Sequence, residues 1–247
     1  MTEISFCCLI NWGRALEVLV GAGGWDYFDT AEEDRLRAYA RHFRFVEVNS
    51  TFYHIPRLKT VRSWRRRVPR DFVFSVKCNR VATHEYSLRP VEETFRAMEW
   101  MSMVCRLLRS EMLVLQTPTS LKVDEDKIHE VSTILKNTNL EHIQVFWEAR
   151  TPWNAGMFHK MEREMLDEGI MPVVDLSKEK PISDSKMVYS RLFSHGSPWF
   201  SDETIEKIRN RVSESRAERV ALAFHGSSMY RDAARYIEFS REKGYNS

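Results

Sequence analysis

The chain contains no hydrophobic run long enough to cross a membrane, and it contains few cysteines. No apolar run approaches the ~20 residues that span a bilayer. Residues 1–17 carry Glu3, Asn11 and Arg14, where a signal peptide needs an unbroken apolar stretch. The four cysteines form no C-x-x-C pair and no disulfide-dense pattern. These absences favour a reduced, cytoplasmic protein that has no membrane partner.

The chain also has almost no net charge, because it contains 37 basic and 35 acidic residues. No global field would therefore draw the protein to nucleic acid. The stretch from Arg57 to Arg70 is a local exception, since it holds seven basic residues and no acidic one. We interpret this basic stretch as a solvated helix surface with counter-charges on neighbouring helices. The alternative interpretation is a contact with a nucleic-acid backbone.

Several motifs of nucleotide and metal sites are missing. The glycines of GAGGW, residues 21–25, lack the G-x-G-x-x-G spacing, and no Walker A sequence occurs. The chain also lacks H-x-H and H-E-x-x-H spacings, so no pattern specifies a metal site. The sequence requires no cofactor, although a divalent metal remains an open alternative at clustered carboxylates and imidazoles, which include His225.

The repeated alternation of apolar runs and amphipathic stretches predicts the fold. A length of 247 residues fits one large domain. We predict an α/β fold: a single (β/α)8 TIM-type barrel of eight parallel strands at 18–247, preceded by a short N-terminal extension at 1–17. The alternative is an open doubly wound sheet. The predicted strands are 19–25, 43–51, 72–79, 112–118, 143–150, 171–177, 187–194 and 219–226. The predicted helices are 32–42, 58–67, 91–108, 124–137, 155–168, 201–215 and 228–243.

Polar residues gather at the carboxyl ends of these predicted strands. Glu47 and Asn49 stand in an otherwise apolar, β-branched run, on the face opposite Val46 and Val48. Burying such groups unpaired costs on the order of 2–7 kcal/mol for a neutral polar group, and more for a charge. Barrel enzymes carry their functional groups at this end of the strands. The sequence therefore predicts a site at the rim, and the alternative is a structural ring of ion pairs joining Glu47 or Glu148 to nearby cations.

Several segments together resemble the YecE-like domain-of-unknown-function family. The most specific are VEVNSTFYHIP at 46–56, DFVFSVKCNRVATH at 71–84 and FWEARTPW at 146–153. The resemblance implies a TIM barrel but no established activity. It implies a site at positions that correspond here to Glu47, Asn49, Tyr53, Lys77, His84, Gln116, Glu148, Arg150, Asp175, Arg191 and His195. The chain departs from the family where His225 and Gly226 replace paired asparagines.

Three functions remain open from the sequence. The leading hypothesis is an enzyme that binds a small anionic substrate through Lys77, Arg150 and Arg191. In that hypothesis Glu47 and Glu148 act as general base and acid, with His84 or His195 as a proton shuttle. The amides of Asn49 and Gln116 would orient the substrate, and Tyr53, Trp153 and Asp175 would complete its site. The alternatives are a nucleic-acid-directed, metal-assisted phosphodiesterase and a non-catalytic ligand-binding barrel.

Overall fold

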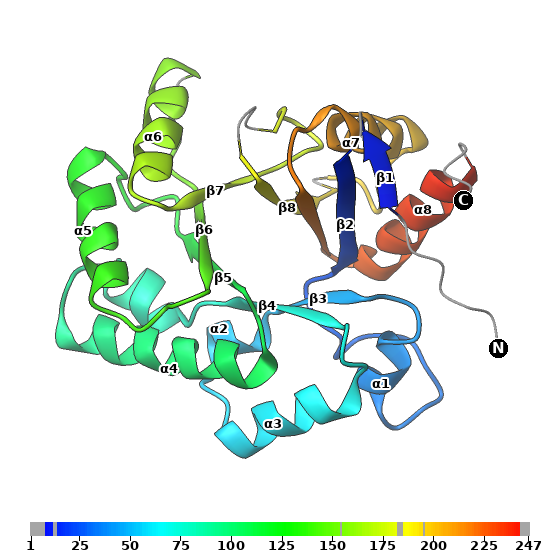
Figure 1. The fold of residues 1–247 in the computed structure, drawn as a ribbon, viewed down its shortest axis with the longest axis horizontal. Coiled ribbons are helices and arrows are strands. Elements are labelled where there is room, and N and C mark those ends of the chain that lie inside the picture. Colours follow the sequence, from blue (N-terminus) through cyan, green and yellow to red (C-terminus); the bar gives the residue numbers. More distant parts are fainter. Residues whose placement is uncertain (1–7, 12–13, 154, 182–184, 195, 243–247) are drawn as a thin grey trace.

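The chain forms a closed barrel of parallel strands surrounded by helices (Figure 1). The structure is a computed structural model that describes residues 8–11, 14–153, 155–181, 185–194 and 196–242. Strands β2 to β9 neighbour one another in chain order, and β9 pairs with β2 to close the barrel. All eight pairs around the barrel are parallel. The predicted (β/α)8 barrel is confirmed.

The described elements alternate along the chain. The strands are β1 (Cys8–Asn11), β2 (Arg14–Ala22), β3 (Phe45–Val48), β4 (Val73–Lys77), β5 (Met112–Thr117), β6 (Gln144–Ala149), β7 (Met171–Val174), β8 (Met187–Phe193) and β9 (Arg219–His225). The α-helices are α1 (Arg35–Tyr39), α2 (Ser50–Tyr53), α3 (Leu58–Arg67), α4 (Glu92–Leu108), α5 (Glu125–Lys136), α6 (Ala155–Asp167), α7 (Asp202–Glu214) and α8 (Met229–Glu242), and one π-helix spans Val81–Glu85.

The first two strands differ from the sequence-based expectation. β1 pairs with β2 in an antiparallel hairpin, and β2 begins at Arg14. The first barrel strand therefore crosses the boundary predicted between the extension and the barrel. The strand predicted at 43–51 ends at Val48 instead, because Asn49 caps a short helix that begins at Ser50. Thr51 consequently does not share a strand face with Glu47.

Side chains alternate between a core inside the barrel and a core under the helices. Phe45, Val114, Phe146 and Tyr189 pack inside the barrel. The neighbouring β3 residues Val46 and Val48 join the larger outer core beneath the helices. Because strand side chains have a period of two, Phe45 and Glu47 share the inner face. The apolar interior thus occupies the lower levels of the barrel, and the polar residues lie above it.

A tyrosine joins the first two barrel strands. The Tyr39 hydroxyl accepts a hydrogen bond from the Ala22 amide at 2.8 Å and donates one to the Phe45 carbonyl at 2.7 Å. A Cβ at Gly21 would lie 1.9 Å from the Phe45 carbonyl oxygen and 2.8 Å from the Tyr39 hydroxyl. Glycine is therefore required here, because β2 and β3 approach closely around the inserted phenol.

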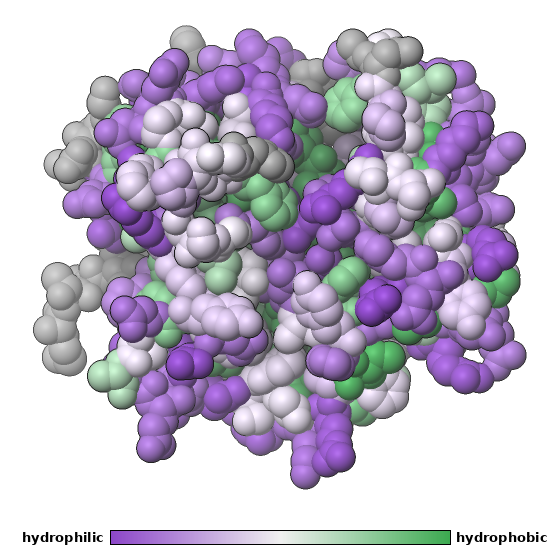
Figure 2. Space-filling view, turned by 180° about the vertical axis from the view of Figure 1, so that it is seen from behind, coloured by the Kyte–Doolittle hydropathy of each residue, from purple (hydrophilic) through white to green (hydrophobic). Residues whose placement is uncertain are grey.

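The surface mixes polar and apolar residues. Figure 2 shows hydrophilic side chains over most of one face, with small hydrophobic patches between them. Among the helices in the described ranges, none has the length and apolar character needed to span a bilayer.

Candidate active site

A buried ion pair between Glu47 and Arg191 lies inside the barrel. Glu47 comes from β3 and Arg191 from β8. The Nε and Nη2 atoms of Arg191 donate to the two carboxylate oxygens of Glu47, each at 3.1 Å. Burial is the largest single effect and would raise the pKa of Glu47, but Arg191, His225 and Lys77 together hold this pKa well below its ordinary value. Glu47 is therefore a carboxylate locked in a bidentate pair.

Three neutral side chains complete this network. The Tyr189 hydroxyl donates to Glu47 at 2.9 Å and lies 2.6 Å from the Ser75 hydroxyl. The Nε of Arg191 also donates to Nε2 of His225 at 3.2 Å. Because a guanidinium has no acceptor, this contact makes Nε2 the acceptor and places the imidazole proton on Nδ1. Burial and the Arg191 charge lower the pKa of His225, which keeps its ring neutral.

The imidazole of His225 is held by its close neighbours. A Cβ at Gly23, just after β2, would lie 2.2 Å from Nδ1 of this ring. The Phe193 ring stacks on the imidazole with centroids 4.7 Å apart and planes 15° apart. The absence of a side chain at Gly23 thus makes room for His225, and Phe193 fixes the plane of its ring.

Glu148 extends the network toward the rim. It accepts a hydrogen bond from Nη1 of Arg191 and one from Nε of Arg150 at 2.8 Å. Its side chain is 17% exposed, whereas that of Glu47 is fully buried. Burial would raise the pKa of Glu148, but the two arginine charges lower it. Glu148 is consequently an ionised carboxylate nearer to solvent than Glu47.

Lys77, the last residue of β4, lies beside this network without joining it. It is 5% exposed, and its ammonium has no hydrogen bond or ion pair within the described part of the chain. Its Nζ lies 4.0 Å from the centroid of the Phe52 ring. Burial and the Arg191 charge lower the pKa of Lys77 to about 8, although Glu47 and Glu148 act in the opposite direction. Lys77 is therefore a largely buried cation that loses its proton more readily than an ordinary lysine.

Two short segments after β3 and β4 place the rings near Lys77. The Asn79 side chain donates to the Thr51 carbonyl at 2.8 Å and accepts from the Val81 amide at 3.0 Å. It thereby ties α2 to the π-helix, an element that occurs frequently at functional sites. Phe52 from α2 meets His84 from the π-helix edge to face, with centroids 4.9 Å apart. Burial and the Lys77 charge lower the pKa of His84.

Two amide side chains at this end of the barrel leave polar atoms unused. The Oδ1 of Asn49 is buried and accepts no hydrogen bond from the described residues. Gln116, on β5, is 7% exposed, and its side-chain amide likewise contacts no donor or acceptor in those ranges. Buried polar atoms are seldom left unpaired, so the Asn49 oxygen calls for an explanation. A bound ligand would supply the missing partners.

Other predicted site residues lie apart from the mouth cluster, the name used below for Glu47, Lys77, Glu148, Arg150, Arg191 and His225. Tyr53 is 61% exposed on α2. The Trp153 indole donates to the Val123 carbonyl at 3.0 Å and packs on the outer core. Asp175 accepts hydrogen bonds from Ser177 and pairs with Lys178 at 2.9 Å. His195 lies outside the described residues, so its predicted role stays a prediction.

Sequence reasoning placed Ser75 on the strand face of Lys77 but missed three aromatic neighbours. Tyr189 precedes Arg191 by two residues, so strand periodicity alone could have placed it on the same inner face. No such signal marks Phe52 and Phe193 in the sequence, because an aromatic residue in either segment is explained equally well by packing in the core and by a place in the site. The alternative of a structural ion-pair ring is realised in part, since Arg191 joins both glutamates while Lys77 joins neither.

A hollow lies beside the mouth cluster at Phe193. It encloses about 490 Å³ and is lined mainly by hydroxyl and aromatic side chains, including Ser177, Ser194, Ser197 and Trp199. The Phe193 ring contributes to this hollow and also lies 5.8 Å from the Arg150 guanidinium. A molecule bound by Arg150 could therefore extend into a neighbouring space rich in hydrogen-bonding groups.

The predicted metal alternative can be compared with the positions of possible ligands. Across the described ranges, no three His, Cys, Asp or Glu side chains gather in a way that could hold a metal ion. The carboxylates of that alternative are Glu47 and Glu148, which are bound by Arg191, and Asp175, which pairs with Lys178.

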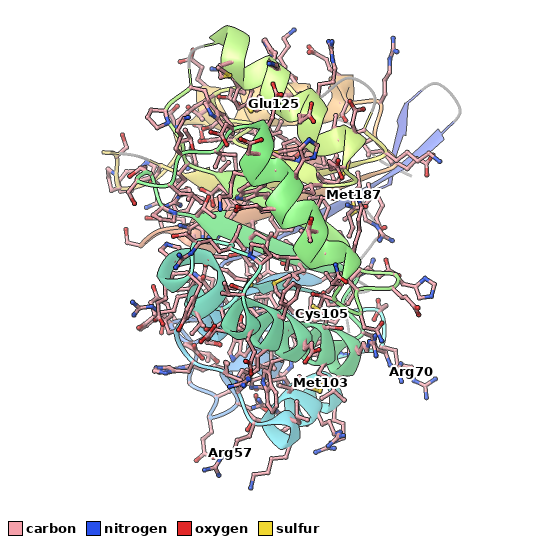
Figure 3. All side chains as sticks on the ribbon, turned by 90° about the vertical axis from the view of Figure 1, so that its left-hand side faces the viewer. Arg57, Arg70, Met103, Cys105, Glu125 and Met187 are labelled. Atoms are coloured by element: carbon pink, nitrogen blue, oxygen red, sulfur yellow. The ribbon has the colours of Figure 1, made fainter. Side chains whose placement is uncertain are left out.

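The basic stretch from Arg57 to Arg70 lies on the outside of the barrel. Arg67 pairs with Asp34 at 3.1 Å, and Arg65 donates to the Phe72 carbonyl at 2.7 Å. Arg57 and Arg70 extend outward on opposite sides of the molecule (Figure 3). In the described structure the exposed cations without a hydrogen bond or ion pair in this stretch are Arg57, Lys59, Arg62, Arg66 and Arg70. Helix α3 is thus a largely uncompensated basic surface.

The fold and the mouth cluster define a (β/α)8-barrel protein with an ionised cluster at the carboxyl ends of its strands. The chain belongs to the family described as "Protein of unknown function DUF72", whose model matches residues 19–243. The family resemblance found in the sequence is thereby confirmed.

Individual relatives agree with this assignment. The chain is 38% identical over 58 residues to the UPF0759 protein YecE of Escherichia coli strain K12, a match that covers 24% of this chain and 21% of the relative. The match thus spans about a fifth of the length of that curated relative. A crystal structure of a DUF72 family protein from Thermotoga maritima superposes with a TM-score of 0.72 at 17% identity, covering 91% of this chain and 99% of the other. An AP endonuclease of family 2 from Brucella melitensis shares the fold at a TM-score of 0.56 and 11% identity, with 93% and 100% covered.

Proposed function

We propose that the protein is an enzyme that binds a small anionic substrate, bearing a carboxylate or a phosphate, at the barrel mouth. The observation that carries this proposal is Lys77, a 5% exposed lysine whose ammonium has no hydrogen bond or ion pair among the described residues. The mouth cluster contains two carboxylates and three cations, so one positive charge is uncompensated when His225 is neutral. An unpaired buried charge is costly, and a bound anion would remove that cost.

The hydrogen bonds suggest how the roles are divided. Arg191 already uses Nε and both Nη atoms on Glu47 and Glu148, so we assign it the task of holding the two carboxylates. Lys77 and Arg150 are then the groups that bind the anion. The amides of Asn49 and Gln116 are available to orient the substrate.

Proton transfer falls to the groups nearest the opening. Glu148 is an ionised carboxylate and is more exposed than Glu47, which suits it to act as general base. The pKa of Lys77, lowered to about 8, lies near neutral pH, where a general acid is most effective. His84 would relay protons at the rim, and its lowered pKa keeps it neutral and able to both accept and donate.

Anion binding tests this proposal directly. We expect inorganic phosphate and small carboxylates to raise the melting temperature of the protein, because a ligand at 100 times its Kd stabilises the folded state by about 2.7 kcal/mol. A Lys77→Met variant should bind at least about tenfold more weakly, since a hydrogen bond to a charged group contributes about 1.5–3 kcal/mol. The control is Lys59→Met on α3, which removes an exposed lysine remote from the mouth. Equal binding by both variants would contradict the proposal.

The basic stretch from Arg57 to Arg70, which includes α3, supports a second candidate, a function directed at nucleic acid. The five exposed cations of this stretch without partners in the described structure could contact several phosphates along a backbone. This candidate predicts that affinity for DNA or RNA falls steeply with salt, with a slope reduced by Arg62→Gln and Arg66→Gln. Binding that is absent at moderate salt would reject it. A non-catalytic barrel, the third hypothesis, predicts that Glu47→Gln and Glu148→Gln leave ligand affinity measurable and that no bound ligand is turned over.

A further inference from the structure

Lys77 differs from every other lysine in the described ranges. It alone is buried, while lysines that are partly shielded or exposed either pair with acidic groups or extend into solvent. Lys127, for example, is 13% exposed at its side chain and pairs with Glu130. Lys59, Lys186 and Lys207 lie on the surface. The placement of Lys77 is therefore not what surface solubility or a structural ion pair requires.

The surroundings of Lys77 match those of a nucleophilic amine. A lysine becomes nucleophilic when it loses its proton, and it does so readily when it is desolvated or placed beside another cation. The Phe52 ring shields Nζ on one side at 4.0 Å, and the charge of Arg191 acts on the same group. No carboxylate lies within ion-pair distance to hold the proton on Nζ in the described structure.

We propose that Lys77 forms an imine with an aldehyde or ketone that also carries a carboxylate or phosphate group. This inference rests on the proposed function, because Arg150 would hold the anionic group while Nζ attacks the carbonyl carbon. The Lys77 ammonium and the carbonyl compound yield a protonated imine and one water molecule. The carbonyl oxygen leaves with two of the three ammonium protons, and the third stays on nitrogen.

This step preserves the charge of the mouth cluster. One positive charge on Nζ before the reaction becomes one positive charge on the iminium nitrogen afterwards, so Glu47 and Glu148 continue to face a cation. The iminium withdraws electrons from bonds at the neighbouring carbon, which makes a proton there acidic. Glu148, held ionised by Arg150 and Arg191, is the carboxylate placed to accept that proton.

Reductive trapping tests the covalent step. The protein is incubated at pH 7 with pyruvate, glyoxylate or dihydroxyacetone phosphate and sodium cyanoborohydride, and the modified lysines are mapped by peptide mass spectrometry. A pKa of about 8 gives Lys77 roughly two hundred times more free amine at pH 7 than an ordinary lysine near 10.4. Because burial slows access, we expect labelling of Lys77 at least about tenfold above Lys59, Lys186 and Lys207 with one or more of the three probes.

Two further measurements separate this inference from the proposed function. Lys77→Arg keeps a cation at the mouth but cannot form an imine, so it should retain phosphate binding and lose the adduct. Lys127→Met, which removes the next most shielded lysine, should leave the labelling of Lys77 unchanged. Phosphate binding without a Lys77 adduct from any probe would overturn the imine and leave the proposed function standing. Absence of phosphate binding would overturn both, and labelling spread evenly over surface lysines would also reject the imine.

Discussion

Replacing Arg191 with methionine should destabilise the barrel by about 3–5 kcal/mol, because it leaves a buried charge without its partner. The change removes both hydrogen bonds to Glu47 and the bond to Glu148. Glu47 is fully buried and would keep, among the described residues, the Tyr189 hydroxyl at 2.9 Å and the more distant Nε2 of His225 at 3.6 Å. In a domain of this size each kcal/mol shifts the melting temperature by about 2–4 °C, so the expected decrease is about 6–20 °C.

The barrel supplies a matched control at its opposite end. Arg219 also joins two glutamates, Glu17 at 2.5 Å and Glu111 at 3.0 Å, but its side chain is 34% exposed. Partly exposed pairs contribute about 0–1 kcal/mol, so Arg219→Met should cost much less than Arg191→Met. Denaturant unfolding of both variants measures this difference in the free energy of unfolding. Equal losses would show that burial does not set the strength of the Arg191 pairs.

A double-mutant cycle and its pH dependence test the mechanism. Glu47→Gln should destabilise the parent protein, which loses a buried pair, but stabilise the Arg191→Met variant, which loses an unpaired charge. In the parent, the lowered pKa of Glu47 contributes stability above about pH 4.3 that is lost as the pH falls. In Arg191→Met, burial should raise this pKa, so stability is lost as the pH rises. The difference in the free energy of unfolding between the parent and Arg191→Met should therefore increase from pH 5 to pH 8. A difference in the free energy of unfolding that is constant with pH would refute the reasoning. A loss of stability below about 1 kcal/mol in Arg191→Met would refute it as well.

Two further substitutions and one measurement test the parts that position this network. Tyr39→Phe should lower the free energy of unfolding by about 1–3 kcal/mol, because it leaves the buried Ala22 amide and Phe45 carbonyl without their partner. The control Tyr27→Phe, at an 85% exposed position, should leave denaturant unfolding unchanged. Gly23→Ala should displace the His225 ring, since the new Cβ would lie 2.2 Å from Nδ1; unchanged 15N shifts of this imidazole would contradict the packing. Nitrogen NMR of His225 should show the Nδ1–H tautomer at neutral pH and titration below pH 6.5. The neutral form of this imidazole therefore contributes stability that is lost as the pH falls. A protonated ring at pH 7 would contradict the Arg191 contact.

The strands and long helices could be predicted because periodicity and caps determine them locally. Helix α3 spans the predicted residues, and α5 begins after Asp124, whose side chain accepts from the Lys127 amide. The short helix α2 and the π-helix could not be predicted, because contacts between segments form them. The Thr51 hydroxyl donates to the carbonyls of Val48 and Lys77, and Asn79 crosses from β4 to α2. Partners 26 and 28 residues apart leave no pattern in a local window.

The inward direction of Glu47 followed from strand periodicity, but its partner could not follow from the sequence. Lys77, Arg150 and Arg191 all stand at strand ends with a suitable charge, so each could have paired with either glutamate. Geometry decides which cation pairs with Glu47, because a planar guanidinium can donate to both carboxylate oxygens in a bidentate pair and an ammonium cannot. Arg191 binds both oxygens of Glu47 and still reaches Glu148.

This choice of partner decides whether the mouth can be reactive. If Lys77 had paired with Glu47, the two charges would cancel, and a carboxylate would hold the proton on Nζ. Because Arg191 satisfies both carboxylates, Lys77 keeps no acceptor among the described residues and lies against the Phe52 ring instead. The structural ion network and the unpaired amine are therefore two consequences of one arginine. Removing that arginine should return the Lys77 pKa toward its ordinary value, since the Arg191 charge that lowers this pKa would be gone, and trapping at Lys77 should fall with it.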